Sequence, residues 1–237
     1  MKIALCGSSG KMGKIVAKTA VEASHAIVAE IGRSTDLENC ISQMPDVFID
    51  FSSPVGTIAV CQLAAGLKIP VLIGTTGLSD GDREKIVECA RNIPILMASN
   101  FSIGVHVARK LVREAAERLP SYFDIEIVEK HHSKKKDAPS GTALSMLADV
   151  SECRKNVSAT FGRHGKCERI PEEICVHAVR GGDTCGEHTV FFFGRGEVIE
   201  VTHRAGTREV FAMGAILAAE KFTIVKRPGL YELSDVI

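Results

Sequence analysis

The chain lacks several features that would point to a nucleic-acid partner. It contains no tryptophan, and aromatic residues make up only 5% of it, so side chains that could stack on bases are scarce. Lysine plus arginine and aspartate plus glutamate both number 29, so no overall positive charge would attract a polyanion. We therefore expect no nucleic-acid partner.

The chain also lacks the signatures of a membrane, secreted or metal-binding protein. No apolar run is long enough to span a bilayer, and the first residues predict a strand rather than a signal peptide. The eight cysteines include no CxxC pair, so no zinc or redox site is indicated. We expect a cytoplasmic protein with reduced, structural thiols, no membrane contact and no metal.

What the chain has, first of all, is a strand, a glycine-rich turn and a helix at its beginning. An apolar strand over 2–6 precedes GSSGKMG at 7–13, and a helical pattern follows over 14–23. Such a turn lets the backbone approach a pyrophosphate, which the positive end of the helix attracts. The glycine spacing is GxxGxxG rather than the common GxGxxG. The candidate cofactor-binding residues here are Gly7, Ser8, Ser9, Gly10, Lys11 and Met12.

The alternation of strands and helices continues through the first hundred residues. The predicted strands cover 26–31, 47–51, 71–74 and 95–98, and the predicted helices cover 55–67 and 80–92. This order is typical of a Rossmann-like, doubly wound parallel sheet in an α/β fold. Ligands of such a sheet bind beyond the carboxyl ends of its strands. The further candidate cofactor-binding residues at these ends are Gly74, Thr75, Thr76, Ala98, Ser99, Asn100 and Phe101.

The end of the second strand bears on the choice of nicotinamide cofactor. An acidic side chain there favours the free ribose of NAD, whereas an arginine suits the 2′-phosphate of NADP. Arg33 lies just after that strand, while Glu30 lies slightly early. We expect NADPH as the cofactor, with NADH as the alternative; an ordinary surface role for Arg33 also stays open.

The rest of the chain predicts a second, α+β domain with a mixed, largely antiparallel sheet. The predicted elements are a helix over 103–119 and strands over 122–129, 173–179, 188–193 and 198–203. No long helix separates the last two strands, which favours antiparallel pairing. A final helix over 209–221 is expected to return to the first domain. The predicted domains are 1–101 completed by 208–237, for the dinucleotide, and 102–207, for substrate and oligomerisation.

A loop before a predicted helix over 142–153 concentrates reactive side chains in the segment EKHHSKKKDAPSGTA at 129–143. The N–H groups of Ser140, Gly141 and Thr142 at the helix start, together with the lysines, predict a carboxylate site. His131 and His132 beside them offer a proton donor near neutral pH. Solvated side chains without function are the alternative, but their concentration in one loop favours a site.

Blocks across almost the whole chain resemble the dihydrodipicolinate reductase family of lysine and diaminopimelate biosynthesis. The most specific is HHxxKxDAPSGTA at 131–143, and the others are 7–13, 50–52, 74–77, 98–101, 182–189 and 200–214. The resemblance implies NAD(P)H-dependent reduction of 4-hydroxy-tetrahydrodipicolinate, a small cyclic dicarboxylate, to tetrahydrodipicolinate. It also implies a homotetramer joined through the sheets of the second domains.

Specific roles follow from the resemblance. It implies His131 as the general acid, Lys135 as a second proton donor, His132 as a substrate contact, and Gly141 with Thr142 as the binding site of one carboxylate. The helix start adds Ser140 as a further candidate substrate contact. In the first domain it implies that 8–12 bind pyrophosphate, while 74–76 and 98–101 line the nicotinamide. The segment 143–175 is shorter than in many relatives, and His106 replaces a common asparagine. His188 and His203 lie in strand patterns, and we interpret both as structural.

Two other functions stay open from the sequence. One is a different NAD(P)-dependent dehydrogenase of amino-acid metabolism. An acyl-transfer mechanism would need a catalytic cysteine with a base, and no cysteine here follows a strand beside a histidine. The other is a non-catalytic NAD(P)-binding sensor, which would leave the segment 131–142 without a role.

Overall fold

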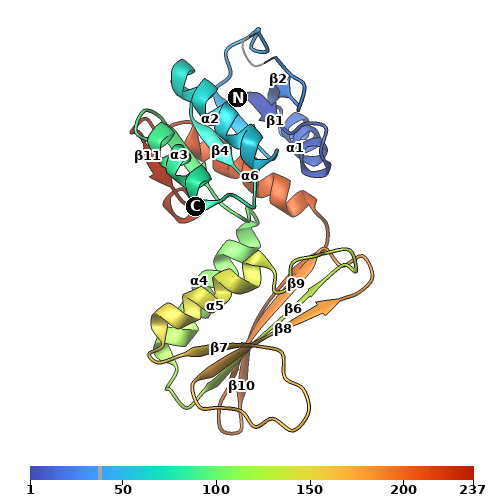
Figure 1. Ribbon diagram of the computed structural model, residues 1–237, viewed down its shortest axis with the longest axis vertical. Helices are drawn as coiled ribbons and strands as arrows, with labels where there is room; N and C mark the ends of the chain where they lie inside the picture. Colours follow the sequence, from blue (N-terminus) through green and yellow to red (C-terminus); the bar gives the residue numbers. More distant parts are fainter. Residues whose placement is uncertain (37–38) are drawn as a thin grey trace. The chain divides into compact units, whose positions relative to one another are not determined.

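The computed structural model describes residues 1–36 and 39–237, and the chain divides into two compact units (Figure 1). Unit 1 comprises Met1–Ile103 and Arg208–Ile237, and unit 2 comprises Gly104–Thr207. The two junctions predicted from the sequence lie at 101–102 and 207–208. Each unit contains one β-sheet and its own hydrophobic core.

Unit 1 is built on a six-stranded sheet in which every pairing is parallel. In spatial order its strands are β11 (Gly229–Tyr231), β5 (Pro94–Met97), β4 (Val71–Ile73), β3 (Val47–Asp50), β1 (Lys2–Cys6) and β2 (Ala26–Ile31). The predicted doubly wound sheet is thus confirmed. β11 was not predicted, because three residues carry no periodic pattern and only the pairing with β5 defines this strand.

Helices cover both faces of this sheet, which explains why its central strands are apolar without alternation. They are α1 (Lys11–Glu22), α2 (Pro54–Leu67), α3 (Asp80–Ala90) and α6 (Glu209–Phe222), and a short 3₁₀ helix, η1 (Leu233–Asp235), follows β11. On β1, Leu5 lies in a core with α1 and α6, whereas Cys6 lies in a core with α2 and α3. Ser53 caps the start of α2 by accepting the N–H of Gly56 at 3.3 Å.

Unit 2 packs two helices, α4 (Ile103–Arg118) and α5 (Gly141–Cys153), against a five-stranded sheet (Figure 1). The strand order is β10 (Val198–Ala205), β9 (Gly186–Phe193), β6 (Asp124–His131), β8 (Glu173–Arg180) and β7 (Ser158–Phe161). The predicted mixed sheet is confirmed, but antiparallel pairs make up only half of it. β10–β9 and β9–β6 are antiparallel, whereas β6–β8 and β8–β7 are parallel. Two crossovers explain the parallel half. One runs through α5 from β6 to β7 and the other through 162–172 from β7 to β8, so all three strands run in the same direction.

The alternation of side chains along β6 decides which of them face the helices. Ile125 and Ile127 are buried in the core with α4 and α5. Glu129 and His131 continue on the same face beyond these apolar residues, and both are buried. Glu126 points to the opposite face. Among the described residues, no helix is both long and apolar enough to cross a membrane.

Candidate active site

The loop between β1 and α1 has the backbone geometry of a dinucleotide site. Gly7 has a φ of +78°, and a Cβ there would lie 2.4 Å from the carbonyl oxygen of Phe51. A Cβ on Gly13 would lie 2.1 Å from the carbonyl oxygen of Gly7, so α1 packs directly on the loop. Gly10 is the N-cap of α1 and supplies no capping side chain, which leaves the positive end of the helix to an anion. These features fit the pyrophosphate of a dinucleotide.

A buried carboxylate, Asp50 at the end of β3, orders the neighbouring strand ends. It accepts hydrogen bonds from the hydroxyls of Thr57 at 2.6 Å and Thr75 at 2.8 Å, and from the N–H of Ser52 at 3.1 Å. Burial raises the pKa of Asp50, and these hydrogen bonds counteract part of that effect. Thr75, a predicted cofactor residue, is therefore buried and bonded to Asp50, whereas Thr76 is exposed. In the sequence, Asp50 appears only within the matching block 50–52, since a strand pattern does not show which hydroxyls reach it.

The other predicted cofactor residues of unit 1 lie at the ends of β4 and β5. A Cβ on Gly74 would lie 2.2 Å from the ring of Phe51, so glycine lets this ring lie against the strand end. Phe101 is buried, and its ring lies edge-on to that of Phe51 with centroids 6.1 Å apart. Asn100 Oδ1 accepts the N–H of Ser102 at 2.8 Å and shapes the turn after β5. Of the remaining residues, Ser8, Met12 and Ala98 are half-buried, and Ser9, Lys11 and Ser99 are exposed.

Arg33 lies close in the chain to a contact between the glycine loop and β2. The N–H of Gly7 donates to the carbonyl oxygen of Ile31 at 2.7 Å, so the loop and the end of β2 are bonded together. Arg33 follows two residues later and is exposed. This position is compatible with a contact to the 2′-phosphate of NADP.

In unit 2 the reactive side chains gather around the carboxylate of Glu129, which is 0% exposed. Its Oε2 lies 2.6 Å from His131 Nδ1, and its Oε1 accepts the N–H of Ser140 at 3.0 Å. Arg180 of β8 donates from Nη1 to Oε2 at 2.8 Å and from Nη2 to Oε1 at 2.6 Å. We call Glu129, His131, Ser140 and Arg180 the Glu129 cluster. One carboxylate thus joins β6, β8 and the start of α5.

Burial and the charged neighbours shift the pKa values of Glu129 and His131. Burial raises the pKa of Glu129, but the hydrogen bonds from Arg180, His131 and the Ser140 N–H outweigh burial and hold that pKa below its usual value. Burial lowers the pKa of His131, the contact with Glu129 offsets part of this effect, and Lys135 and Arg180 reinforce it. The cluster therefore combines an ionised carboxylate with an imidazole that gives up its proton readily.

The second ring nitrogen of His131 faces β9. A Cβ on Gly186 would lie only 2.9 Å from His131 Nε2, so glycine keeps the space beside this nitrogen open. The ring of His188 lies edge-on to that of His131, with centroids 5.1 Å apart, and its Nε2 is 2.9 Å from Ser140 Oγ. Burial lowers the pKa of His188 to about 4, so this ring is neutral near pH 7. Its strand pattern did not reveal which residues it meets across the sheet.

The loop before α5 carries the other predicted substrate contacts. Lys135 Nζ lies 2.7 Å from Asp137 Oδ2, and the side chain of Lys135 is 21% exposed. The N–H of His132 donates to the carbonyl oxygen of Thr184 at 2.9 Å, which connects this loop to the turn between β8 and β9. Lys135 and His132 therefore belong to the same end of the unit 2 sheet as His131.

Ser140 does not offer its N–H to a ligand, which corrects our expectation. This N–H donates to Glu129, and Ser140 Oγ caps α5 by accepting the N–H of Ala143 at 3.2 Å. The sequence could not show this engagement, because Glu129 belongs to the preceding strand. Gly141 and Thr142, the first two residues of α5, remain candidates for binding a carboxylate.

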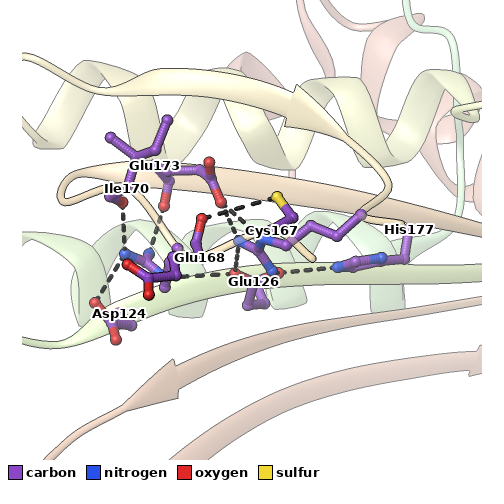
Figure 2. Close-up of polar contacts among 9 residues, drawn as sticks. Asp124, Glu126, Cys167, Glu168, Ile170, Glu173 and His177 are labelled. Carbon is purple, nitrogen blue, oxygen red and sulfur yellow. Dashed lines mark hydrogen bonds and ion pairs between the residues drawn. The ribbon is translucent and has the colours of Figure 1, made fainter. Parts of the chain in front are cut away.

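One group on the other face of β6 has the composition of a metal site. Ligand atoms of Glu126, Cys175 and His177 lie within 4.8 Å of one another. Arg163 already donates to both oxygens of Glu126, at 3.1 and 2.7 Å, and His177 Nε2 lies 2.9 Å from Glu126 Oε2 (Figure 2). Arg163 also pairs with Glu173. Because a guanidinium already neutralises these carboxylates, Glu126, Arg163, Glu173 and His177 form an ion-pair network, which we call the Glu126 cluster.

The chain matches known sequences over its whole length. Family models for the N-terminus and the C-terminus of dihydrodipicolinate reductase match residues 1–101 and 104–237. A 4-hydroxy-tetrahydrodipicolinate reductase of Caldanaerobacter subterraneus subsp. tengcongensis is 46% identical over 253 residues. A protein of the same name from Geobacter sulfurreducens is 41% identical over 263 residues. Each alignment covers 100% of this chain and 98% of the relative.

Solved structures show the same relationship. A dipicolinate-bound dihydrodipicolinate reductase from Paenisporosarcina sp. TG-14 has a TM-score of 0.80 and 25% identity, covering 100% of this chain and 99% of that one. A probable dehydrogenase from Thermotoga maritima, with a TM-score of 0.64 and 11% identity over 99% of this chain and 92% of that one, shares the fold alone. With both family models and relatives above 40% identity matching it, the chain belongs to the dihydrodipicolinate reductase family.

Proposed function

We propose that this chain catalyses the NAD(P)H-dependent reduction of 4-hydroxy-tetrahydrodipicolinate to tetrahydrodipicolinate, in lysine and diaminopimelate biosynthesis. Membership of the reductase family supports the reaction. The observation that carries the proposal is His131, whose Nδ1 contacts the buried Glu129 while its Nε2 lies beside the open position at Gly186. A proton donor in one cluster with a helix N-terminus suits a substrate that must be protonated and that carries carboxylates.

The overall reaction adds one hydride and one proton to the substrate ring, and the hydroxylated form of the ring also loses one water. The bound nicotinamide supplies the hydride. His131 Nε2 gives its proton to a ring carbon, which leaves a neutral imidazole whose Nδ1–H stays bonded to Glu129. Lys135 acts as a second proton donor, and its ammonium group attracts a substrate carboxylate.

The start of α5 is proposed to bind one substrate carboxylate. The N–H groups of Gly141 and Thr142 lie in the first turn of this helix, where the helix dipole favours an anion. His132 contacts the substrate from the neighbouring loop. Ser140 is not included among the substrate contacts, because Glu129 and the helix cap already engage it.

Unit 1 is proposed to bind the cofactor. The glycine loop at 7–12 holds the pyrophosphate at the start of α1. The segments 74–76 and 98–101 line the nicotinamide, with Thr75 and Phe101 acting from buried positions. Arg33 pairs with the 2′-phosphate of NADPH, which makes NADPH the preferred cofactor over NADH.

We also propose a homotetramer that forms through the unit 2 sheet. Phe191 and Phe193 stack on the face opposite the helices, with centroids 5.5 Å apart. Val198 pairs with Phe193 across β10 and β9 and is 48% exposed. Apolar surface of this kind favours burial against another copy. Analytical ultracentrifugation tests the proposal, and a monomer at micromolar concentration would contradict it.

The function is tested with substrate made by a synthase from pyruvate and aspartate semialdehyde. Oxidation of NADPH or NADH is followed by the absorbance of the reduced nicotinamide. We expect rapid oxidation that depends on the synthase product. NADPH binding without any oxidation would contradict the reductase and would favour a sensor.

The cofactor preference is tested with Arg33→Ala. A hydrogen bond to a charged group contributes about 1.5–3 kcal/mol, so the KM for NADPH should rise about 10- to 100-fold. The KM for NADH should change less than about twofold, since no phosphate contact is lost. Arg83→Ala, an exposed arginine on α3, is the matched control. Equal losses with both cofactors would refute the phosphate contact.

A further inference from the structure

We propose that Glu129 is the positioning residue of this reductase. It holds His131 with Nε2 toward the substrate and also fixes the start of α5, so that the proton donor and the carboxylate-binding helix end keep a constant spacing. This inference rests on the proposed role of His131 as the general acid. Glu129 does not itself touch the substrate in this proposal.

The hydrogen bonds of Glu129 support a role through its neighbours. Oε2 lies 2.6 Å from His131 Nδ1 and accepts Arg180 Nη1 at 2.8 Å. Oε1 accepts the Ser140 N–H at 3.0 Å and Arg180 Nη2 at 2.6 Å. A carboxylate has about four acceptor positions, and all are used here. The buried carboxylate therefore has no acceptor position left for a ligand, and it acts by orienting what it binds.

The contact with Glu129 decides which nitrogen of His131 can react. An ionised carboxylate only accepts hydrogen bonds, so Nδ1 of His131 carries a proton. Nε2 is then the nitrogen that exchanges a proton with a substrate. Gly186 keeps the space beside Nε2 open. A flipped ring would place a C–H group against Glu129 and lose this hydrogen bond.

Glu129 also holds the start of α5 in place, through its hydrogen bond with Ser140. The Ser140 N–H is bound by Glu129, while its Oγ accepts the Ala143 N–H and lies 2.9 Å from His188 Nε2. Ser140 Oγ and His188 Nε2 share one hydrogen bond, whose direction follows the tautomer of the His188 ring. The residue just before Gly141 is thus held at both its N–H and its hydroxyl. The start of α5 cannot shift relative to His131 without breaking one of these bonds.

Several charged or titratable groups face His131, and Glu129 is the one that favours its protonated form. Arg180 on β8 and Lys135 in the loop disfavour the imidazolium. His188 on β9 lies against the ring, and His203 on β10 pairs with His188 in the sheet. Loss of the Glu129 charge should therefore shift the titration of His131 to lower pH.

Glu129→Gln tests the proposal, because it keeps the size of the side chain and removes its charge. We expect kcat at pH 7 to fall about tenfold or more, since general acid catalysis contributes about 10²–10⁴-fold. The pH at which kcat declines on the alkaline side should move lower, and the KM for the substrate should rise. Glu129→Asp should restore the pH profile in part. The KM for NADPH should stay unchanged, since unit 1 carries the cofactor site.

Glu126→Gln is the matched control. Glu126 lies on the same strand and also binds an arginine and a histidine, Arg163 and His177, on the opposite face (Figure 2). The kcat of Glu126→Gln should stay within about twofold of the wild-type value, and the pH profile should not move. If both variants lower kcat alike and neither moves the profile, Glu129 has only a structural role and the positioning proposal is wrong.

A second measurement needs no turnover. Nitrogen-15 NMR of the His131 ring should show a protonated Nδ1 and a titrating Nε2 in the wild-type protein. In Glu129→Gln the ring should show a mixture of tautomers. A wild-type ring that is protonated mainly on Nε2 would overturn the proposal.

His131→Gln, measured in parallel, distinguishes the proposed acid role of His131 from the proposed positioning role of Glu129. If this variant keeps the wild-type kcat, the proposed acid role of His131 fails. If it loses activity while Glu129→Gln keeps the wild-type pH profile and substrate KM, the acid role stands and the positioning role alone fails.

Discussion

The Glu129 cluster and the Glu126 cluster use nearly the same side chains on one strand. In each, a glutamate of β6 binds an arginine through both oxygens and a histidine at less than 3 Å. Glu129 and His131 have side chains 0% and 10% exposed, whereas Glu126 and His177 are 13% and 34% exposed. The composition of a cluster therefore does not decide whether it can act as a site.

The surroundings account for the difference. At the Glu129 cluster, the start of α5 lies on the carboxylate, and a glycine leaves one histidine nitrogen with open space beside it. At the Glu126 cluster, Arg163 and Arg169 come from the segment between β7 and β8 and pair with Glu126, Asp124 and Glu173 (Figure 2). Those contacts hold a connecting segment on the sheet. We expect the first cluster to control turnover and the second to contribute mainly to stability.

Replacement of His131 and of His177 should produce the largest difference in kcat between the two clusters. His131→Gln removes the proton donor, so kcat at pH 7 should fall about 10²–10⁴-fold while NADPH binding persists. His177→Gln removes a histidine from the Glu126 cluster, and its kcat should stay within about twofold. Steady-state kinetics and NADPH fluorescence titration provide both readouts. Equal losses of kcat would abolish the distinction between the clusters.

The next-largest effect should be a loss of stability in acid, caused by His188, whose ring lies against His131 of the Glu129 cluster. In the folded protein the pKa of His188 is about 4, below the ordinary value of 6.5. Between pH 6.5 and about pH 4, His188 therefore binds a proton in the unfolded chain but not in the folded chain. Stability should therefore fall as pH drops from about 6.5 to about 4, by about 3 kcal/mol in total from this group. Urea unfolding at a series of pH values measures the loss. His188→Gln should flatten the dependence, and an unchanged slope in this variant would contradict the assignment.

The smallest expected effect is that of one methyl group beside His131. In Gly186→Ala, the new Cβ would lie 2.9 Å from Nε2, and the ring cannot move freely because Glu129 holds it. We expect kcat to fall about tenfold, as a displacement of a reacting group below 1 Å can cost up to about 10²-fold. Gly196→Ala, which also has a positive φ but whose Cβ meets no atom within 4 Å, is the control for backbone strain. Wild-type kcat in Gly186→Ala would show that the space beside Nε2 is not needed.

Much of the fold follows from local patterns. The alternation of apolar strands and helices predicts the first five strands of unit 1, and helix spacing predicts α4 and α5 to within a few residues. The strand β7, with its half-exposed and exposed residues at 158–161, carries no clear alternation and was not predicted. Half of the unit 2 sheet is parallel rather than antiparallel, because strand direction depends on a crossover whose path the pattern does not encode.

The candidate site was predicted only in part. The composition of the segment 129–143 indicates His131, Lys135 and the helix start, since these residues are neighbours in the chain. The prediction of a free Ser140 N–H was wrong, because a free helix N–H and one bound to a distant carboxylate look alike in sequence. The contacts of Arg180 with Glu129, and of Gly186 and His188 with His131, were not predicted, since these residues lie about fifty positions apart.

The sequence by itself determined which residues form strands and helices, which face of each strand is apolar, and which short segments concentrate reactive groups. These properties depend on neighbours within a few residues, where periodicity and capping act. Only the tertiary structure decided which charge pairs with which. The register of β6 with β8 and β9 brings Arg180, His188 and Gly186 to Glu129 and His131. That register depends on the packing of the whole sheet against its helices, which no local pattern records.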